Sequence, residues 1–238
     1  MCGFLVTNGG QSGLVWRSGD KISYRGPDST TELHNMGRYN MAFHRLAIID
    51  PSPKSNQPLR LSTHPQYLLV CNGEIYNYKK LMQDIGHTPQ TGSDCEVIIP
   101  LVASYGIKKA CEMLDGVFAF VIYDADSGKF HAGRDAFGVR PAFIARSGPK
   151  FGIASEAKAL IDMFDRIDVF PPGTCWNSDK PRYFDRWYHY KWEEDQAMSE
   201  TDASDGAWYY LVEAVAKRMM SDRPLGSLLS GGLDSSLI

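Results

Sequence analysis

The chain has 238 residues, of which 43% are hydrophobic, and a formal net charge of −3. This length and apolar content suffice for a substantial core in one domain or one and a half. The sequence contains no basic block, so we expect no nucleic-acid partner. It also contains no apolar run of about 20 residues and no leader, so we expect a cytoplasmic protein without membrane association.

Cys2 is one of five widely spaced cysteines with no C-x-x-C pair, a pattern that indicates neither a disulfide framework nor a metal site. When Met1 is removed, Cys2 carries a thiol and a free α-amine on one carbon. An amine with a pKa near ~8 takes the proton of a thiol with a pKa near ~8.5, as in threonine nucleophiles with an N-terminal amine. The alternative is a small residue that merely precedes the apolar strand predicted at 3–7.

Two apolar segments lead to polar residues suited to substrate binding. The segment 41–50 contains Arg45, which is either a solvated strand-edge residue or a bidentate clamp for a carboxylate. The strand predicted at 67–71 runs into Asn72 and Gly73. An Asn-Gly pair is typical of a hairpin turn, but a side-chain amide beside a backbone N–H also suits an oxyanion hole.

Helical signals follow this strand. A short helix is predicted at 78–85. Ser93 or Asp94 is a candidate N-cap of the next helix, and taken alone the two residues indicate capping and not ligand binding. Pro100 is expected to kink that second helix or end it early, and Gly106 is expected to stop it.

The segment from residue 116 to residue 154 is rich in predicted strands. Residues 116–124 and 129–134 form a predicted hairpin, 143–145 and 151–154 are two further strands, and Ser155 is expected to cap a helix. Many strands with few helices fit a sandwich of sheets between helical layers.

The last third of the chain changes character. Apolar residues at helical spacing between 208 and 219 predict a helix with an exposed apolar stripe, followed by a short strand at 225–229. Residues 230–236 read Ser-Gly-Gly-Leu-Asp-Ser-Ser, which is either a flexible turn or a loop that cradles phosphates. The loop lacks the Gly-Lys-Ser/Thr ending of a Walker A motif.

Eight motifs occur in one order: Met1-Cys2-Gly3, Arg25-Gly26-Pro27-Asp28, His44-Arg45-Leu46, Asn72-Gly73-Glu74-Ile75-Tyr76-Asn77, Gly92-Ser93-Asp94, Gly133-Arg134-Asp135, Ala154-Ser155-Glu156-Ala157-Lys158-Ala159-Leu160 and Ser230-Gly231-Gly232-Leu233-Asp234-Ser235-Ser236. No single motif is decisive. The ordered set resembles the N-terminal part of glutamine-dependent asparagine synthetase over the whole chain.

The resemblance implies an α+β fold, a four-layer αββα sandwich of the N-terminal-nucleophile type. It implies a class II glutamine amidotransferase (glutaminase) domain at 2–188, a linker at 189–204, and the beginning of an α/β ATP-binding synthetase domain at 205–238. Because the chain ends at Ile238, we expect the synthetase half to be largely missing.

The resemblance also implies residue roles. Cys2 attacks the side-chain amide of L-glutamine, with Asn72 and Gly73 stabilising the oxyanion, and Arg25 braces the nucleophile. The implied glutamine-binding residues are Arg45, Leu46, Ala47, Ile48, Ile49, Asn72, Gly73, Glu74 and Asp94. The implied ATP-binding residues are Leu229, Ser230, Gly231, Gly232, Asp234, Ser235 and Ser236.

The implied partner is a synthetase domain or chain that uses the ammonia, together with ATP and Mg²⁺, to amidate aspartate to asparagine. The glutaminase itself is expected to need no cofactor. The oligomeric state stays open, with a homodimer as one candidate because members of the family often form dimers. Two alternatives stay open: a glutaminase subunit for another ATP-dependent amidotransferase, and a non-catalytic glutamine-binding remnant. The presence of Cys2 argues against the remnant.

Overall fold

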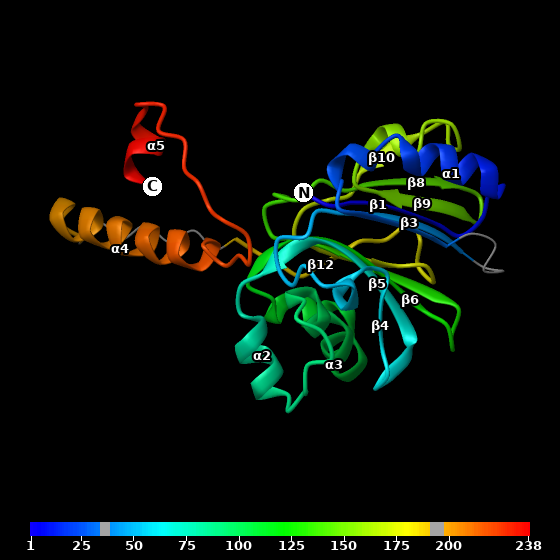
Figure 1. The fold of residues 1–238 in the computed structure, drawn as a ribbon, viewed down its shortest axis with the longest axis horizontal. Helices are drawn as coiled ribbons and strands as arrows, with labels where there is room; N and C mark the ends of the chain where they lie inside the picture. Colours follow the sequence, from blue (N-terminus) through cyan, green and yellow to red (C-terminus); the bar gives the residue numbers. More distant parts are fainter. Residues whose placement is uncertain (34–38, 191–197) are drawn as a thin grey trace. The chain divides into compact units, whose positions relative to one another are not determined.

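The computed structural model describes residues 1–33, 39–190 and 198–238. Contacts divide the chain into two units, residues 1–189 and 190–238. In the first unit two six-stranded antiparallel sheets lie face to face, and helices cover their outer faces (Figure 1). The predicted αββα sandwich is confirmed.

The first sheet has the strand order β10-β8-β9-β1-β3-β2. Its strands are β1 (Gly3–Thr7), β2 (Ser29–Leu33), β3 (Asn40–Arg45), β8 (Phe143–Ser147), β9 (Lys150–Ala154) and β10 (Ile167–Val169). Strand β1 pairs with β3 on one side and β9 on the other, so the start of the chain is held in the interior of the sheet. Helix α1 (Ser12–Asp20) packs on the outer face through Val15.

The second sheet has the order β12-β11-β7-β6-β5-β4. Its strands are β4 (Leu59–Leu61), β5 (His64–Ile75), β6 (Gly116–Asp124), β7 (Lys129–Arg134), β11 (Thr174–Asn177) and β12 (Asp185–Arg186). Helices α2 (Tyr78–Asp84) and α3 (Ile98–Met113) cover its outer face. Short 3₁₀ turns lie at η1 (Ser23–Arg25), η2 (Pro53–Ser55), η3 (Asp94–Val97) and η4 (Ala157–Ala159).

The alternation of side chains along each strand decides what faces the space between the sheets. In β1, Phe4 enters the core between the sheets, whereas Leu5 packs towards α1. In β5, Val70 enters the same core as Phe4. Because side chains repeat every two residues, Cys2 and Asn72 lie on the inner faces of opposite sheets.

The hairpin alternative for the Asn-Gly pair is wrong. Strand β5 continues through Asn72 and Gly73 to Ile75, paired with β6 along this length. The close pairing requires glycine, because a Cβ at position 73 would lie 2.7 Å from the Val117 carbonyl oxygen. Long-range pairing with β6 thus overrides the local turn preference of Asn-Gly.

Pro100 does not kink or shorten its helix. Helix α3 begins at Ile98, so Pro100 falls in the first turn, where a backbone N–H has no intrahelical acceptor in any case. The regular backbone is instead interrupted at Gly106, with φ 76° and ψ 166°, before α3 ends at Met113.

One expectation near β1 is also wrong. The helix expected after Ser155 is only the 3₁₀ turn η4, because the Ser155 hydroxyl accepts a hydrogen bond from the Phe4 N–H at 3.0 Å instead of capping a helix. This bond ties the start of β1 to the end of β9.

In the second unit, α4 (Glu200–Arg218) begins inside the predicted linker 189–204, of which 191–197 lie outside the described residues. The strand expected at 225–229 is absent, because nothing in the described part of this unit pairs with it. Trp208 in α4 is 57% exposed, which confirms the exposed apolar stripe. No helix of the described residues is both long and apolar enough to cross a membrane.

We expect Gly26→Ala to lower the free energy of unfolding by about 3 kcal/mol or to prevent folding, because a Cβ there would lie 2.1 Å from the His44 carbonyl group. The matched control is Gly13→Ala in α1, where a Cβ meets no atom within 4 Å and helix propensity favours alanine. Urea unfolding of both variants checks this. Equal stability of the two variants would contradict it.

Candidate active site

A small pocket lies beside the N-terminus, at the start of β1. Its lining residues are Met1, Cys2, Arg45, Leu46, Ile48, Ile49, Ser55, Gln57, Cys71, Asn72, Gly73, Glu74, Ser93, Asp94, Cys95 and Arg140. The structure therefore brings together all the residues expected to act on glutamine except Ala47. They come from the residue before β1, the end of β3 and the segment after it, the end of β5 and the turn before α3.

The Cys2 thiol is held against the backbone of Leu46. Its Sγ donates to the Leu46 carbonyl oxygen at 3.6 Å and accepts from the Leu46 N–H at 3.4 Å. Burial raises the pKa of the Cys2 thiol, and the Leu46 hydrogen bond opposes that shift. A raised pKa means that Cys2 needs a base close by before it attacks as a thiolate.

Arg25 fixes the backbone of the candidate nucleophile. Its Nε donates to the Cys2 carbonyl oxygen at 2.9 Å, and its Nη1 forms an ion pair with Glu156 Oε1 at 2.8 Å. The contact matches the bracing role that the resemblance implies. Glu156 anchors the guanidinium from the far end.

The amino terminus of the chain lies at this pocket, on Met1. The amino terminus on Met1 has a pKa lowered chiefly by burial, with the charges of Arg140 and Arg25 acting in the same direction. Removal of Met1 transfers the free amine to Cys2 itself. A lowered pKa favours the neutral amine, which is the form that accepts a proton.

The Gly73 N–H points away from β6. Gly73 lies opposite Phe118 in β6. The Phe118 N–H donates to Asp135 Oδ2 at 3.2 Å, and the Phe118 carbonyl accepts from the Asp135 N–H at 2.8 Å, so both groups face away from β5. In an antiparallel ladder, the two residues of such a non-hydrogen-bonded pair direct their polar groups away from each other. The Gly73 N–H therefore faces the edge of β5 that borders the pocket.

On this edge the neighbours of Gly73 are already bonded. The Cys71 carbonyl accepts from Gln57 Nε2 at 3.2 Å, and the Ile75 N–H donates to Asp94 Oδ2 at 2.7 Å. Side chains thus replace the missing partner strand at Cys71 and Ile75. The Gly73 N–H lies between these two bonded positions.

Asn72 supplies a second donor beside Gly73. Its side chain is 1% exposed, and its Nδ2 has no hydrogen-bond partner among the described residues. A buried donor without an acceptor destabilises a fold by about 1–3 kcal/mol, so it indicates a ligand acceptor at this place. Asn72 and Gly73 together can bind one oxygen with two hydrogen bonds.

Asp94 and Glu74 differ in how their charges are compensated. Asp94 is 4% exposed, and burial raises its pKa to about 6. The hydrogen bond from the Ile75 N–H lowers this pKa, and the negative charge of Glu74 raises it. Glu74 forms an ion pair with Arg140 Nη2 at 2.7 Å. Asp94 is thus an incompletely compensated anion at neutral pH, suited to a cationic ligand group.

Arg45 shapes the loop that follows β3. Its Nη1 donates to the Ser52 carbonyl at 2.9 Å and to Asn56 Oδ1 at 2.8 Å, and its Nη2 donates to the carbonyls of Ile49 and Asp50. The expected clamp for a carboxylate therefore also organises the loop over residues 46–56. A direct bidentate contact with a ligand requires some of these bonds to be exchanged.

The sequence reasoning missed Gln57 and Arg140 as pocket residues. Arg140 lies on a loop built by Asp135, which accepts the N–H groups of Val139 and Arg140 at 2.9 and 3.0 Å. Arg140 Nε is buried and has no partner among the described residues. The only signal was the density of charged residues at 134–140, which does not indicate where the loop folds.

The expected ATP loop lies in the second unit and is exposed. Helix α5 (Leu233–Leu237) starts directly after Gly232, and the Ser236 hydroxyl donates to the Gly232 carbonyl at 2.8 Å. Gly231 has φ +80°, which favours glycine. In the described residues no three His, Cys, Asp or Glu side chains form a group that could hold a metal ion.

The fold and the pocket together define a class, an αββα sandwich with a cysteine directly before its first strand. Two solved structures share the fold. The glutamine phosphoribosylpyrophosphate amidotransferase from B. subtilis, in complex with ADP and GMP, has a TM-score of 0.64 and 22% identity, covering 79% of this chain and 50% of that one. The allosteric regulatory enzyme of purine biosynthesis has a TM-score of 0.62 and 20% identity, with the same coverage.

Residues 1–170 match the family described as glutamine amidotransferase domain, and residues 209–238 match the family described as asparagine synthase. The chain belongs to the glutamine amidotransferase family, which confirms the resemblance inferred from the motifs.

Curated relatives match the chain over its whole length. The glutamine-hydrolysing asparagine synthetase of Sandersonia aurantiaca is 39% identical over 246 residues, covering 100% of this chain and 46% of the relative. Asparagine synthetase 2 of Arabidopsis thaliana is 39% identical and the root enzyme of Pisum sativum 38%, with 42% and 41% of the relative covered. The chain thus spans less than half the length of these relatives.

We expect Asp94→Asn to raise the free energy of unfolding at pH 8 by about 2–3 kcal/mol. The folded-state pKa of about 6 lies above the unfolded value near 3.8, so the ionised carboxylate destabilises the fold at high pH. Below pH ~4 the carboxyl group is protonated in both states, and the gain disappears. Urea unfolding between pH 4 and 8 checks this.

Asp50→Asn is the control of opposite sign. Burial alone raises the pKa of Asp50, but hydrogen bonds from Ser55, Ser52 and the Gly92 N–H outweigh it and hold the pKa well below its usual range. Its ionised form therefore stabilises the fold, and Asp50→Asn is expected to destabilise it at pH 8. An Asp94→Asn protein less stable than the wild type at pH 8 would contradict the prediction.

Proposed function

We propose that this chain hydrolyses the side-chain amide of L-glutamine and releases ammonia. The observation that carries the proposal is the buried, unpartnered Asn72 amide, which lines the same pocket as the Cys2 thiol. An acyl transfer needs a nucleophile on one side of a carbonyl group and hydrogen-bond donors for its oxygen on the other. Cys2 comes from β1 and Asn72 from the opposite sheet, which suits that requirement.

The proposed reaction has two stages. After loss of Met1, the α-amine of Cys2 takes the thiol proton, and the thiolate attacks the amide carbon. The oxyanion accepts hydrogen bonds from Asn72 Nδ2 and the Gly73 N–H, each worth on the order of 3 kcal/mol in the transition state. The proton passes from the amine to the leaving ammonia, and water then hydrolyses the γ-glutamyl thioester to glutamate.

Recognition of the zwitterionic part of glutamine is assigned to opposite charges in the pocket. Arg45, with the backbone of residues 46–49, receives the α-carboxylate, and Asp94 receives the α-ammonium group, with Glu74 beside it. The pKa of about 6 at Asp94 supports this assignment, because the group is ionised at neutral pH and an ammonium ion would compensate its charge.

We propose further that the ammonia serves the amidation of aspartate to asparagine, the activity named for the relatives. In this proposal residues 2–188 are the glutaminase and 205–238 begin the synthetase, with ATP and Mg²⁺ used by the complete protein. Exposed hydroxyl groups and the backbone at Gly231 and Gly232 suit phosphate oxygens, so Leu229 to Ser236 would contribute to holding the ATP phosphates. A cytoplasmic location and a homodimer also belong to this proposal.

A glutaminase for a different ATP-dependent acceptor is the competing proposal. The match of residues 209–238 to the asparagine synthase family favours aspartate as the acceptor. The remnant hypothesis requires a chain that binds glutamine without hydrolysing it, which the next experiment distinguishes.

We expect Cys2→Ala to reduce ammonia release from glutamine to the background rate, because the Cys2 thiol is the nucleophile of the proposed mechanism. Cys111→Ala is the matched control, since Cys111 is buried on α3 and does not line the pocket. Ammonia is measured with a coupled assay, and intact mass establishes the loss of Met1. Wild-type turnover by Cys2→Ala would overturn the proposed mechanism.

We expect Asn72→Ala to lower kcat for glutamine by about 10²–10³, with a much smaller change in KM, because the oxyanion forms only in the transition state. Asn8→Ala is the control, since its amide bonds the Pro149 carbonyl on the surface. Steady-state kinetics of both variants check this. A change confined to KM would assign Asn72 to ground-state binding instead.

A further inference from the structure

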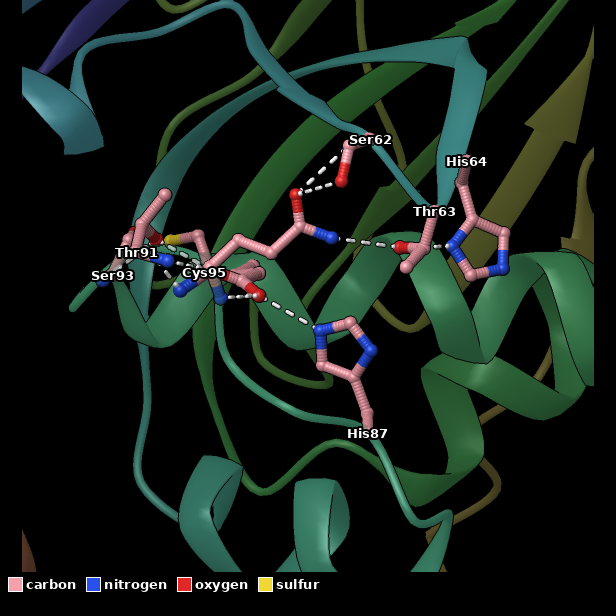
Figure 2. A network of polar contacts seen from close by, with 9 residues as sticks. Ser62, Thr63, His64, His87, Thr91, Ser93 and Cys95 are labelled. Atoms are coloured by element: carbon pink, nitrogen blue, oxygen red, sulfur yellow. Dashed lines mark hydrogen bonds and ion pairs between the residues drawn. The ribbon is translucent and has the colours of Figure 1, made fainter.

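Glu96 is a buried carboxylate that the proposed reaction does not use. It is 0% exposed and lies two residues after Asp94 in η3. Its Oε1 accepts the Gln90 N–H at 2.8 Å and lies 2.7 Å from His87 Nε2. Its Oε2 accepts the N–H and the hydroxyl of Thr91, at 2.7 and 2.6 Å (Figure 2).

The Thr91 hydroxyl relays this anchor to the turn that carries Asp94. It donates to Glu96 and accepts from the Ser93 N–H at 3.1 Å. The Ser93 hydroxyl in turn accepts from the Cys95 N–H at 3.3 Å. The residues on both sides of Asp94 are thus connected to one buried carboxylate.

The same network reaches β5, which carries the candidate oxyanion donors. The Gln90 side-chain oxygen accepts from the N–H and hydroxyl of Ser62, at 2.8 and 2.9 Å, and its Nε2 donates to Thr63 Oγ1 at 3.0 Å. Ser62 and Thr63 form the turn between β4 and β5, as Figure 2 shows beside His64. Glu96 therefore connects the turn at Asp94 to the start of the strand that holds Asn72.

The place of the Asp94 carboxylate is set by the backbone of the turn that carries it and by the hydrogen bonds that it accepts. The hydrogen bond that ties its carboxylate to β5 comes from the Ile75 N–H, at 2.7 Å, and burial still leaves its pKa raised. A carboxylate that must meet an ammonium group has to be placed within a few tenths of an ångström to bind strongly. Residues 87–93 contain no helix or strand, and Glu96 accepts hydrogen bonds from Gln90 and Thr91 within this segment.

We propose that Glu96, acting through the Thr91 hydroxyl, is a positioning residue that holds Asp94 in place for the α-ammonium group of glutamine. The inference rests on the proposed glutaminase function. It assigns the network to recognition of one charged group of the substrate. Loss of the network then weakens binding of substrates with the ammonium group and leaves the chemistry at the amide unchanged.

The test replaces Thr91, which is partly exposed and outside the pocket lining. Thr91→Val keeps the shape and the N–H bond to Glu96 but removes the hydroxyl relay, whereas Thr91→Ser keeps the relay. Each protein is assayed with L-glutamine and with 4-carbamoylbutanoate, which is glutamine without the α-amino group. If the analogue turns over too slowly, its inhibition constant against glutamine replaces its KM.

In Thr91→Val we expect kcat/KM for glutamine to fall about tenfold through KM, the effect of losing roughly one hydrogen bond, with the analogue changed less than about twofold. Thr91→Ser is expected to keep the wild-type preference for glutamine over the analogue. Glu96→Gln, which turns an NH₂ group towards N–H donors, is expected to show the same selective loss with a larger magnitude.

Equal losses for glutamine and its analogue in Thr91→Val would show a general structural role and overturn the inference. Unchanged kinetics in Thr91→Val and Glu96→Gln would overturn it as well. A wild-type protein without Cys2-dependent ammonia release would instead remove the proposed function itself, so the two failures are distinguishable.

Discussion

Carboxylates that accept backbone N–H groups hold the loops around Cys2. Asp28 accepts the Ala47 N–H at 2.7 Å, Asp50 accepts the Gly92 N–H at 2.9 Å, and Asp135 accepts N–H groups of the loop that carries Arg140. Loops that leave a sheet have no ladder partners, so their buried N–H groups must find other acceptors. One carboxylate satisfies several donors at once and fixes the loop in a single conformation.

Asn72 and Asp94, which are assigned to substrate binding and catalysis, lack the compensating partners that the scaffold carboxylates have. The scaffold carboxylates each accept at least one backbone N–H, and the hydrogen bonds at Asp50 hold its pKa low. The Asn72 amide, in contrast, has no partner among the described residues, and the pKa of Asp94 is raised by burial. Groups kept in an unfavourable state by a rigid surrounding are ready to bind a ligand that satisfies them, at the expense of stability in the free protein.

The two sheets place these groups at one pocket by a simple rule of alternation. Cys2 is two residues from Phe4, and Asn72 is two residues from Val70. Side chains two residues apart lie on the same face of a strand, so Cys2 and Asn72 face the space between the sheets, as Phe4 and Val70 do. A shift of either strand by one residue would turn its functional side chain to the opposite face. The register of β1 against β3 and of β5 against β6 therefore sets the geometry of the candidate site.

The amino-acid sequence alone predicts the family, the strands at 3–7 and 116–124, and a set of glutamine-binding candidates of which all but Ala47 line the pocket. These features depend on local composition, period and motif order. Only the tertiary structure decided that β5 passes through Asn72 and Gly73, because pairing with β6 outweighs a local turn preference.

Tertiary contacts also decided the fate of Ser155, of Arg140 and of residues 225–229. Ser155 bonds the Phe4 N–H of a strand about 150 residues away in sequence and caps no helix, and Arg140 reaches Glu74 across the fold. Residues 225–229 form no strand, because a strand exists only with a partner whose N–H and carbonyl groups meet its own. The local sequence pattern carries no signal for partners that are distant in sequence, and this is the physical reason that the structure of these residues could not be predicted from the sequence.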